Sequence, residues 1–167
     1  MIVKKYGGSS LANNTKIKQV AQSISLCPDK QIVVVSAPFG MTNKLLSCAS
    51  DIAKNPPARE LDQMLVTGEM LNASLLAIAL ISLGIRAISL NAYSLGIYAS
   101  SNYGNALIKM IDKRRIEDLF LEYDVIVITG FQGICNKDFV TLGRGGSDTT
   151  ALAIAAIFDV DCLIYTD

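Results

Sequence analysis

The sequence predicts an α/β fold, a three-layer αβα sandwich built around a mainly parallel sheet. Three observations support this prediction: β-branched runs alternate with helix-period segments, the apolar content is high, and small or charged residues follow several runs. Hydrophobic residues make up 51% of the 167 residues and charged residues 18%, with a mean hydropathy of +0.39. Such a chain buries a sizeable core, and its length suits one domain or a large piece of one.

Strand and helix patterns alternate through the first half of the chain. Residues 2–3 open the first strand, and apolar residues then recur at helical spacing over 17–24. The β-branched run at 32–35 is typical of a strand covered on both faces. A helix pattern follows over 45–53 and is broken by Asn55-Pro56-Pro57.

The second half continues the alternation and ends on a strand. Its long apolar stretch predicts a mostly buried helix, and a later segment that is apolar all round predicts a second buried helix. The expected elements, in order, are a helix over 64–82, a strand over 85–90, helical segments over 106–111 and 116–121, a strand over 125–128, a helix over 151–158 and a strand over 162–165. This order of elements indicates a mainly parallel sheet.

Charge and composition exclude several classes of function. Lys and Arg number 15, as do Asp and Glu, and the chain has no His. A neutral chain lacks the basic footprint of a nucleic-acid-binding protein, so we expect no nucleic-acid partner. The missing His removes Ser-His-Asp and Cys-His catalysis, histidine-ligated zinc and histidine general bases. We expect no metal site made by the protein alone.

The cysteines and the apolar segments indicate in which cellular compartment the protein works. The four cysteines, at 27, 48, 135 and 162, form no C-x-x-C pair, so we expect reduced, buried small hydrophobes in a cytoplasmic protein. The N-terminus has no signal-peptide pattern. The most apolar stretch, 73–83, is too short to span a bilayer, so we expect no membrane partner.

Candidate binding residues cluster where the predicted strands end. In open α/β sheets, ligands bind beyond the carboxyl ends of the strands. Lys5-Tyr6-Gly7-Gly8-Ser9-Ser10, Ser36-Ala37, Thr129–Gly133 and Thr166-Asp167 all stand at such ends. Four turns of this composition at one edge predict a binding site there.

Two glycine-bearing segments carry the strongest chemical signal. Gly7-Gly8 beside Lys5 suits a backbone anion nest, although a tight βα turn with a solvated lysine is the more common explanation of so short a glycine motif. Residues 142–150, Leu-Gly-Arg-Gly-Gly-Ser-Asp-Thr-Thr, place Arg144 and three glycines immediately before an apolar helix. Ser147 and Asp148 could simply cap that helix and favour its first turn, but capping does not account for the glycines and Arg144.

The absence of the standard nucleotide and hydrolase motifs narrows the chemistry. The sequence contains no G-x-G-x-x-G, no P-loop and no G-x-S-x-G. Two anion-binding loops without a P-loop indicate a phosphoryl-transfer site of another design. Glu69, an acid within an apolar helical stretch, is either paired with a nearby backbone N–H or lysine, or is a carboxylate that receives a substrate ammonium.

The motifs together resemble the amino-acid kinase family and, within it, the aspartokinases. The resemblance covers the whole chain. Its most specific element is the segment 141–150, Thr-Leu-Gly-Arg-Gly-Gly-Ser-Asp-Thr-Thr. The other matching segments are Lys5–Ser10, Val34–Ala37 with Thr42-Asn43, Thr67-Gly68-Glu69, Thr129–Gly133 and Ile164–Asp167.

The resemblance implies roles for individual residues in a kinase that uses Mg²⁺ and ATP. Lys5 would neutralise the transferred γ-phosphoryl group, and Asp148 would organise the transfer centre. Four residues would hold the small-molecule partner, L-aspartate: Thr42, Glu69, Arg144 and Ser147. The nucleotide would contact Lys5, Tyr6, Gly7, Gly8, Ser9, Thr166 and Asp167. The reaction would be the first step of the aspartate-derived pathway to lysine, threonine and methionine. A carboxylate is already ionised at pH 7, so the missing His agrees with this chemistry.

The sequence departs from the family pattern in two segments. Residues 91–97 keep only the final Gly96-Ile97 of a usual T-G-x-Q-A-G-like segment, and Tyr103-Gly104 stands where the family has His-Gly. The family also continues beyond residue 167 into the rest of the nucleotide pocket and the regulatory ACT domains. We therefore expect residues 1–167 to be the N-terminal portion of a catalytic domain, truncated on its C-terminal side, with little or no activity alone. Because apolar surface would be left uncovered, we expect a homo-oligomer.

Two alternatives stay open. The chain could be an amino-acid kinase for another carboxylate, a carbamate or a nucleotide, although Glu69 with the Arg144 segment favours aspartate. It could instead be a non-catalytic fragment or assembly subunit.

Overall fold

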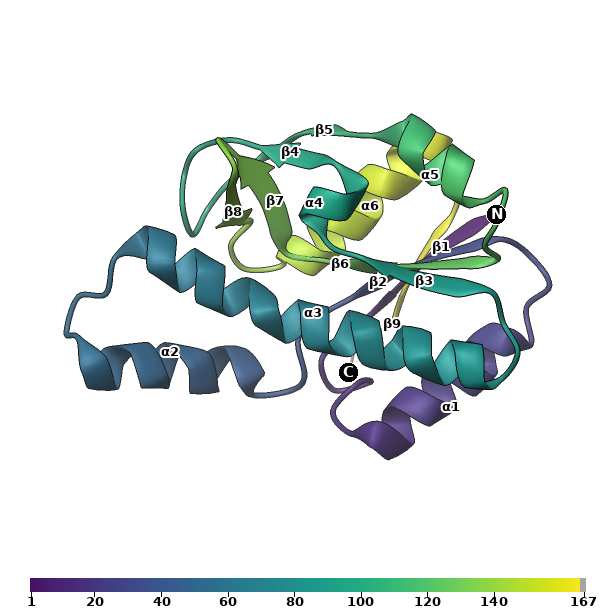
Figure 1. Cartoon of the computed structure of the whole chain (residues 1–167), viewed down its shortest axis with the longest axis horizontal. Helices are drawn as coiled ribbons and strands as arrows, with labels where there is room; N and C mark the ends of the chain where they lie inside the picture. Colours follow the sequence, from purple (N-terminus) through teal and green to yellow (C-terminus); the bar gives the residue numbers. More distant parts are fainter. Residues whose placement is uncertain (166–167) are drawn as a thin grey trace.

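Two β-sheets and six helices make up residues 1–165, the part of the chain that this computed structural model describes (Figure 1). The large sheet is wholly parallel. Its strands, in spatial order, are β3 (Ala87–Leu90), β6 (Val125–Thr129), β2 (Gln31–Val35), β1 (Ile2–Tyr6) and β9 (Cys162–Tyr165). The predicted α/β class and parallel sheet are confirmed.

Helices cover both faces of this sheet. On one face lie α1 (Asn14–Ser25) and α3 (Ala58–Ser82), which run side by side in Figure 1, and α6 (Gly146–Phe158) lies on the other. The middle strands β2 and β6 are buried at every residue, which explains their unbroken β-branched runs. Alternate residues of each strand enter the two separate apolar clusters on either face.

A second, smaller sheet was not predicted. It contains, in spatial order, β5 (Ile108–Ile111), β4 (Ile97–Ala99), β7 (Gln132–Cys135) and β8 (Asp138–Thr141), and it lies on the α6 side of the molecule. The short helix α4 (Ala92–Leu95) precedes β4 in the chain, and α5 (Lys113–Leu119) follows β5. The β7–β8 hairpin turns at Asn136 and Lys137, which both have positive φ, 49° and 70°, as a primed two-residue turn requires.

The expectation of a helix over 106–111 was wrong, because residues 108–111 form strand β5. A short apolar run is ambiguous between helix and strand, and here antiparallel pairing with β4 decides. The segment 151–158 is helical as expected but not buried all round, since Leu152 is 52% exposed.

The cysteines are less buried than expected. All four are free; Cys48 is exposed and the other three are half-buried. No disulfide therefore joins any of them.

The long helix α3 starts at Ala58, directly after Pro57, and has 25 residues instead of the 19 expected. By length and composition it could cross a membrane. In the fold, Val66, Leu76 and Leu80 are buried, and both Leu76 and Leu80 belong to the apolar cluster between the helices and the large sheet. A core helix passes the same length test.

Candidate functional site

A cleft of about 650 Å³ opens where β1, β2 and β6 end, beside α3 and the first turns of α2 (Met41–Ile52) and α6. Six residues singled out in the sequence as catalytic or substrate-binding line it: Lys5, Thr42, Glu69, Arg144, Ser147 and Asp148. They come from four different elements and one loop, and folding brings them to the strand-end edge of the large sheet, where the sequence predicted a binding site.

Lys5 and Asp148 form an ion pair at this cleft. Lys5 lies on the face of β1 that α6 covers, and its ammonium nitrogen is 2.7 Å from Asp148 Oδ1. The Lys5 side chain is almost buried, whereas that of Asp148 is 43% exposed. Opposite charges at this distance attract each other, so the pair holds the Lys5 ammonium at the cleft. Lys5 is thus a nearly buried cation with a partly exposed partner.

The segment before α6 presents Arg144 to the cleft on a glycine-supported turn. Gly143 and Gly145 both have φ of 76°, a left-handed conformation that costs glycine little. The turn leaves Arg144 exposed, and it pairs with no carboxylate in residues 1–165. An uncommitted guanidinium is available to bind a carboxylate or phosphate in bidentate fashion.

The N-terminus of α6 faces the same cleft. Gly145 is the N-cap residue and no side chain caps the helix, so the interpretation of Ser147 as a cap was wrong. Ser147 lies inside the first turn, 7% exposed, and lines the cleft. Asp148 is the acid of that turn, as the capping argument allowed. Free N–H groups and the positive end of the helix dipole favour an anion here.

Glu69 combines the two interpretations that the sequence left open. Its Oε1 accepts a hydrogen bond from the Ala37 N–H at 3.1 Å, which fixes α3 to the turn after β2. Its Oε2 is buried without a partner in the described structure. Burial raises the pKa of the Glu69 carboxyl from 4.5 to about 7, although the backbone hydrogen bonds oppose this shift. One oxygen is structural, and the other is available to a ligand donor.

Helix α2 contributes Thr42 and Asn43 to the lining of the cleft. It begins after Gly40, which has φ of 77°, and has no buried residue. Figure 1 shows α2 running alongside α3 away from the large sheet. The cleft therefore lies between the first turns of two helices, α2 and α6, which suits a ligand with negative charge at both ends.

Tyr6 and Ser9 lie outside this cleft. They line a separate depression with Tyr165, on the side of the sheet covered by α1. The rings of Tyr6 and Tyr165 stack with centroids 4.6 Å apart, and burial raises the pKa of Tyr6 to about 12. The structure does not bring these two expected nucleotide contacts to the other candidate residues.

The backbone at Gly7-Gly8 is already engaged in packing. The Gly7 N–H donates to the Tyr165 carbonyl at 3.1 Å, so it is not a free donor. A Cβ on Gly8 would lie 2.6 Å from the Ala37 carbonyl oxygen, so glycine allows the two strand-end turns to approach closely. The expected nucleotide contacts Thr166 and Asp167 lie outside the described residues.

Sequence reasoning missed several cleft residues, above all Asp62 on α3. It is 1% exposed and accepts hydrogen bonds from the Gly104 N–H and from the N–H and hydroxyl of Thr141. Its position seven residues before Glu69, on the same face of α3, is the signal that could have identified it.

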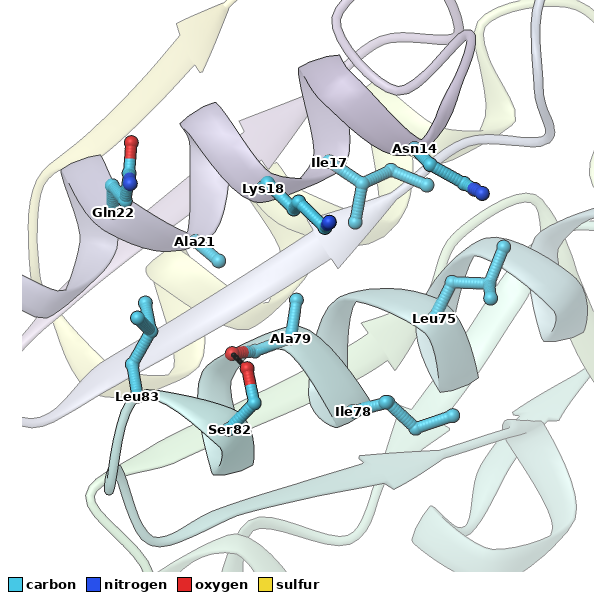
Figure 2. Close-up of a pocket in the computed structure, with 10 residues that line it drawn as sticks. All are labelled: Asn14, Ile17, Lys18, Ala21, Gln22, Leu75, Ile78, Ala79, Ser82 and Leu83. Carbon is cyan, nitrogen blue, oxygen red and sulfur yellow. Dashed lines mark hydrogen bonds between the residues drawn. The ribbon is translucent and has the colours of Figure 1, made fainter.

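A second depression, of about 300 Å³, lies between α1 and α3 (Figure 2). Its walls include Ile17 and Ala21 of α1 and Leu75 and Ile78 of α3. It holds no convergent set of charged groups, so the polar cleft is the better candidate for chemistry. No group of three acidic or cysteine side chains that could hold a metal ion occurs in residues 1–165.

A parallel sheet whose strand ends bring two cations and two helix N-termini to one cleft is an α/β arrangement suited to small anionic molecules. The sequence profile of the amino acid kinase family matches residues 1–167. The chain belongs to this family.

Individual relatives agree with this assignment. The chain is 42% identical over 173 residues to an aspartokinase of Mycolicibacterium smegmatis and 43% identical over 172 residues to an aspartate kinase of Stutzerimonas stutzeri. Both alignments cover 100% of this chain but only 41% and 42% of those relatives' lengths. The structure of aspartate kinase from Synechocystis matches 99% of this chain and 28% of that one, with a TM-score of 0.86 and 39% identity.

Proposed function

We propose that this chain forms the substrate-binding part of an aspartate kinase, which transfers the γ-phosphoryl group of ATP to the side-chain carboxylate of L-aspartate. The observation that carries the proposal is the convergence of Lys5, Glu69 and Arg144 on one cleft, with a buried, unpartnered oxygen on Glu69. Arg144 and Glu69 match a carboxylate and the ammonium of aspartate, and Lys5 matches the transferred phosphoryl group.

Aspartate binding would use both ends of the cleft. The free oxygen of Glu69 accepts hydrogen bonds from the substrate ammonium, and Arg144 holds one carboxylate. Ser147 and Thr42, in the first turns of α6 and α2, donate to substrate oxygens. Carboxylate charge is further stabilised by the two helix N-termini.

Phosphoryl transfer then requires positioning and neutralisation of charge. A side-chain carboxylate oxygen of aspartate attacks the γ-phosphorus while the bond to the β–γ bridging oxygen breaks, and ADP leaves with that electron pair. The product is an acyl phosphate, and no proton has to be removed because the carboxylate is ionised at pH 7. Lys5 stabilises the charge that gathers on the transferred group, and Asp148 holds the ammonium of Lys5 in place.

The cleft residues fit a nucleotide polyphosphate at this point. Lys5, Arg144 and the free N–H groups of α6 are donors for phosphate oxygens, and the Asp148 carboxylate is a suitable oxygen ligand for a phosphate-bound Mg²⁺. When bound, Mg²⁺ supplies charge neutralisation on the phosphates. The structure of E. coli aspartokinase III in complex with aspartate and ADP has this fold, with a TM-score of 0.80 at 21% identity.

The chain spans about 41% of the length of the curated relatives that it matches. We propose that residues 1–167 are the N-terminal portion of a catalytic domain and that the pathway role is synthesis of the lysine, threonine and methionine precursor. Cytoplasmic location is part of the proposal, supported by four free cysteines. Self-association is supported by edge strand β9, where Leu163, Ile164 and Tyr165 are about 40% exposed.

The fold alone does not select the substrate. Isopentenyl phosphate kinase and a uridylate kinase from Archaeoglobus fulgidus share it, with TM-scores of 0.72 and 0.66 at 18% and 22% identity. Glu69 favours a substrate with an ammonium over an isoprenoid phosphate or a nucleotide. The same residue argues against a purely non-catalytic assembly role, because a buried carboxylate oxygen without a partner is costly to a fold that does not use it.

Calorimetric titration tests the proposal. L-Aspartate should bind, and succinate, which lacks the ammonium, should bind at least about tenfold more weakly. Mg-ATP should bind weakly or not at all, and the isolated chain should form little or no aspartyl phosphate. Equal affinity for aspartate and succinate would refute the assigned role of Glu69. Tighter binding of another carboxylate or of a nucleotide would show that aspartate is not the substrate.

A further inference from the structure

Asp62 is a buried carboxylate whose partners belong to two other parts of the chain. It lies near the start of α3 and is 1% exposed. Its Oδ2 accepts from the Thr141 N–H at 2.7 Å and from the Gly104 N–H at 3.0 Å, and its Oδ1 accepts from the Thr141 hydroxyl at 2.8 Å. No cation pairs with it in residues 1–165.

These three hydrogen bonds converge on the base of the Arg144 turn. Thr141 ends β8 and stands three residues before Arg144. The segment around Gly104 packs directly against Gly143, where an added Cβ would lie 3.0 Å from Asn105 Oδ1 and 3.2 Å from the Gly104 carbonyl oxygen. The Thr141 carbonyl in turn accepts from the Ala106 N–H at 2.8 Å. Asp62 therefore links the two segments that support the Arg144 turn, one at Gly104 and the other at Thr141.

Glu69 makes the corresponding contact on the other side of the cleft. It lies seven residues, or two helical turns, after Asp62, so both carboxylates project from one face of α3 about 10 Å apart along the axis. Glu69 holds the turn after β2 through Ala37. A single rigid helix thus sets the separation between the Glu69 carboxylate and the turn that carries Arg144.

We propose that Asp62 is a positioning residue: it fixes the Arg144 turn relative to Glu69, and so sets the spacing between the groups that receive the two charged ends of the substrate. This inference rests on the proposed function. Both oxygens of Asp62 are already used by three protein donors, so its role is to hold the turn and not to contact the substrate.

The test compares three variants of the full chain. Asp62→Leu has nearly the same size but no acceptor, and it leaves two N–H groups and a hydroxyl unpaired. Asp62→Asn retains an acceptor oxygen for the N–H groups, and its amide can donate to the Thr141 hydroxyl. Asp138→Leu is the matched control, because Asp138 also links this hairpin to α3 through Arg59 and to the neighbouring segment through the Tyr103 hydroxyl, but by exposed contacts that contribute little to stability.

Two readouts separate positioning from general stability. Amide hydrogen exchange at Gly104 and across residues 141–146 should accelerate at least about tenfold in Asp62→Leu, while amides of β2 and β6 stay protected. Under conditions where every variant is fully folded, Asp62→Leu should bind L-aspartate at least about tenfold more weakly. Asp62→Asn should stay within about threefold of the wild type in both measurements, and Asp138→Leu should change neither.

The outcomes are distinguishable from those for the proposed function. Unchanged exchange and affinity in a folded Asp62→Leu chain would overturn the inference, as would the same losses in Asp138→Leu. If Asp62→Leu does not fold, Thr141→Val removes only the hydroxyl, and faster exchange confined to 141–146 is then the expected result; uniform exchange across the chain would overturn it. If wild type binds no aspartate, the proposed function fails, and the exchange data still decide the role of Asp62.

Discussion

The Lys5 ammonium near the end of β1 lies 2.7 Å from the Asp148 carboxylate in the first turn of α6. The contact joins residues 143 positions apart in the sequence and places a nearly buried cation at the cleft. Asp148 also competes with any anionic ligand for the same charge. The two residues should therefore have opposite effects on anion binding.

Binding of inorganic pyrophosphate without added metal measures this competition. Lys5→Met should weaken binding about tenfold, because a charge-assisted contact is lost. Asp148→Asn should strengthen binding about two- to fivefold, because Lys5 is released from a partly exposed partner. Lys18→Met, which removes an exposed lysine of α1 remote from the cleft, is the control for net charge. Weaker binding in Asp148→Asn would contradict the competition.

Arg144 should matter for aspartate binding and little for folding. It is exposed and has no carboxylate partner in the described structure, so Arg144→Lys should change the free energy of unfolding by less than about 0.5 kcal/mol. Lysine cannot reproduce a bidentate contact, and affinity for L-aspartate should fall about tenfold. Calorimetry and urea unfolding measure the two effects, with Arg114→Lys as the exposed control. If Arg144→Lys binds L-aspartate as tightly as the wild type, Arg144 does not contact the substrate.

Glu69 makes the stability of the fold depend on pH. Burial raises its pKa from 4.5 to about 7, so the folded state favours the protonated carboxyl. Its contribution is complete below the unfolded pKa and is lost as pH rises through about 7. The difference corresponds to about 3 kcal/mol. Wild type should thus lose up to that amount relative to Glu69→Gln between pH 4 and pH 8, as measured by urea unfolding. Parallel pH profiles of the two proteins would show that Glu69 is not the titrating group.

The same titration should govern aspartate binding with the opposite sign. Only ionised Glu69 attracts the substrate ammonium, so affinity should rise as pH increases from 6 to 8. In Glu69→Gln the affinity should be at least about tenfold lower at pH 8 and should vary little over this range. Calorimetry at several pH values provides the measurement. A wild-type affinity that falls with increasing pH would contradict an ammonium-binding carboxylate.

Edge strand β9 should mediate self-association. Its outer backbone has no neighbouring strand in the described structure, and Ile164 is 40% exposed. Ile164→Lys should shift the association equilibrium toward monomer in sedimentation measurements. Leu152→Lys, which changes an exposed leucine of α6, should leave the equilibrium unchanged. A wild-type chain that is monomeric at high concentration would refute self-association.

The parallel sheet, and the strand ends at which the candidate site lies, could be predicted from the amino-acid sequence. The β-branched runs of β2 and β6 are typical of buried parallel strands. An anion-binding turn is indicated by Gly143, Arg144 and Gly145, because helix capping does not explain glycines and an arginine at that spacing. Lys5 follows from the rule that ligands gather beyond the carboxyl ends of parallel strands, Glu69 from its place as an acid in an apolar helical stretch, and the role expected of Asp148 from the family resemblance.

Three features depend on tertiary packing and could not be predicted from the sequence: the small sheet, the separation of Tyr6 and Ser9 from the cleft, and the contacts of Asp62. A short run such as 108–111 has no preference strong enough to resist pairing with β4. Tyr6 faces away from Lys5 because neighbouring residues of a strand point to opposite faces, and the engaged Gly7 N–H is visible only once β1 is paired with β9. Asp62 is an ordinary helical acid in sequence, and it acquires a role because folding places Gly104 and Thr141, 37 residues apart, against the same carboxylate.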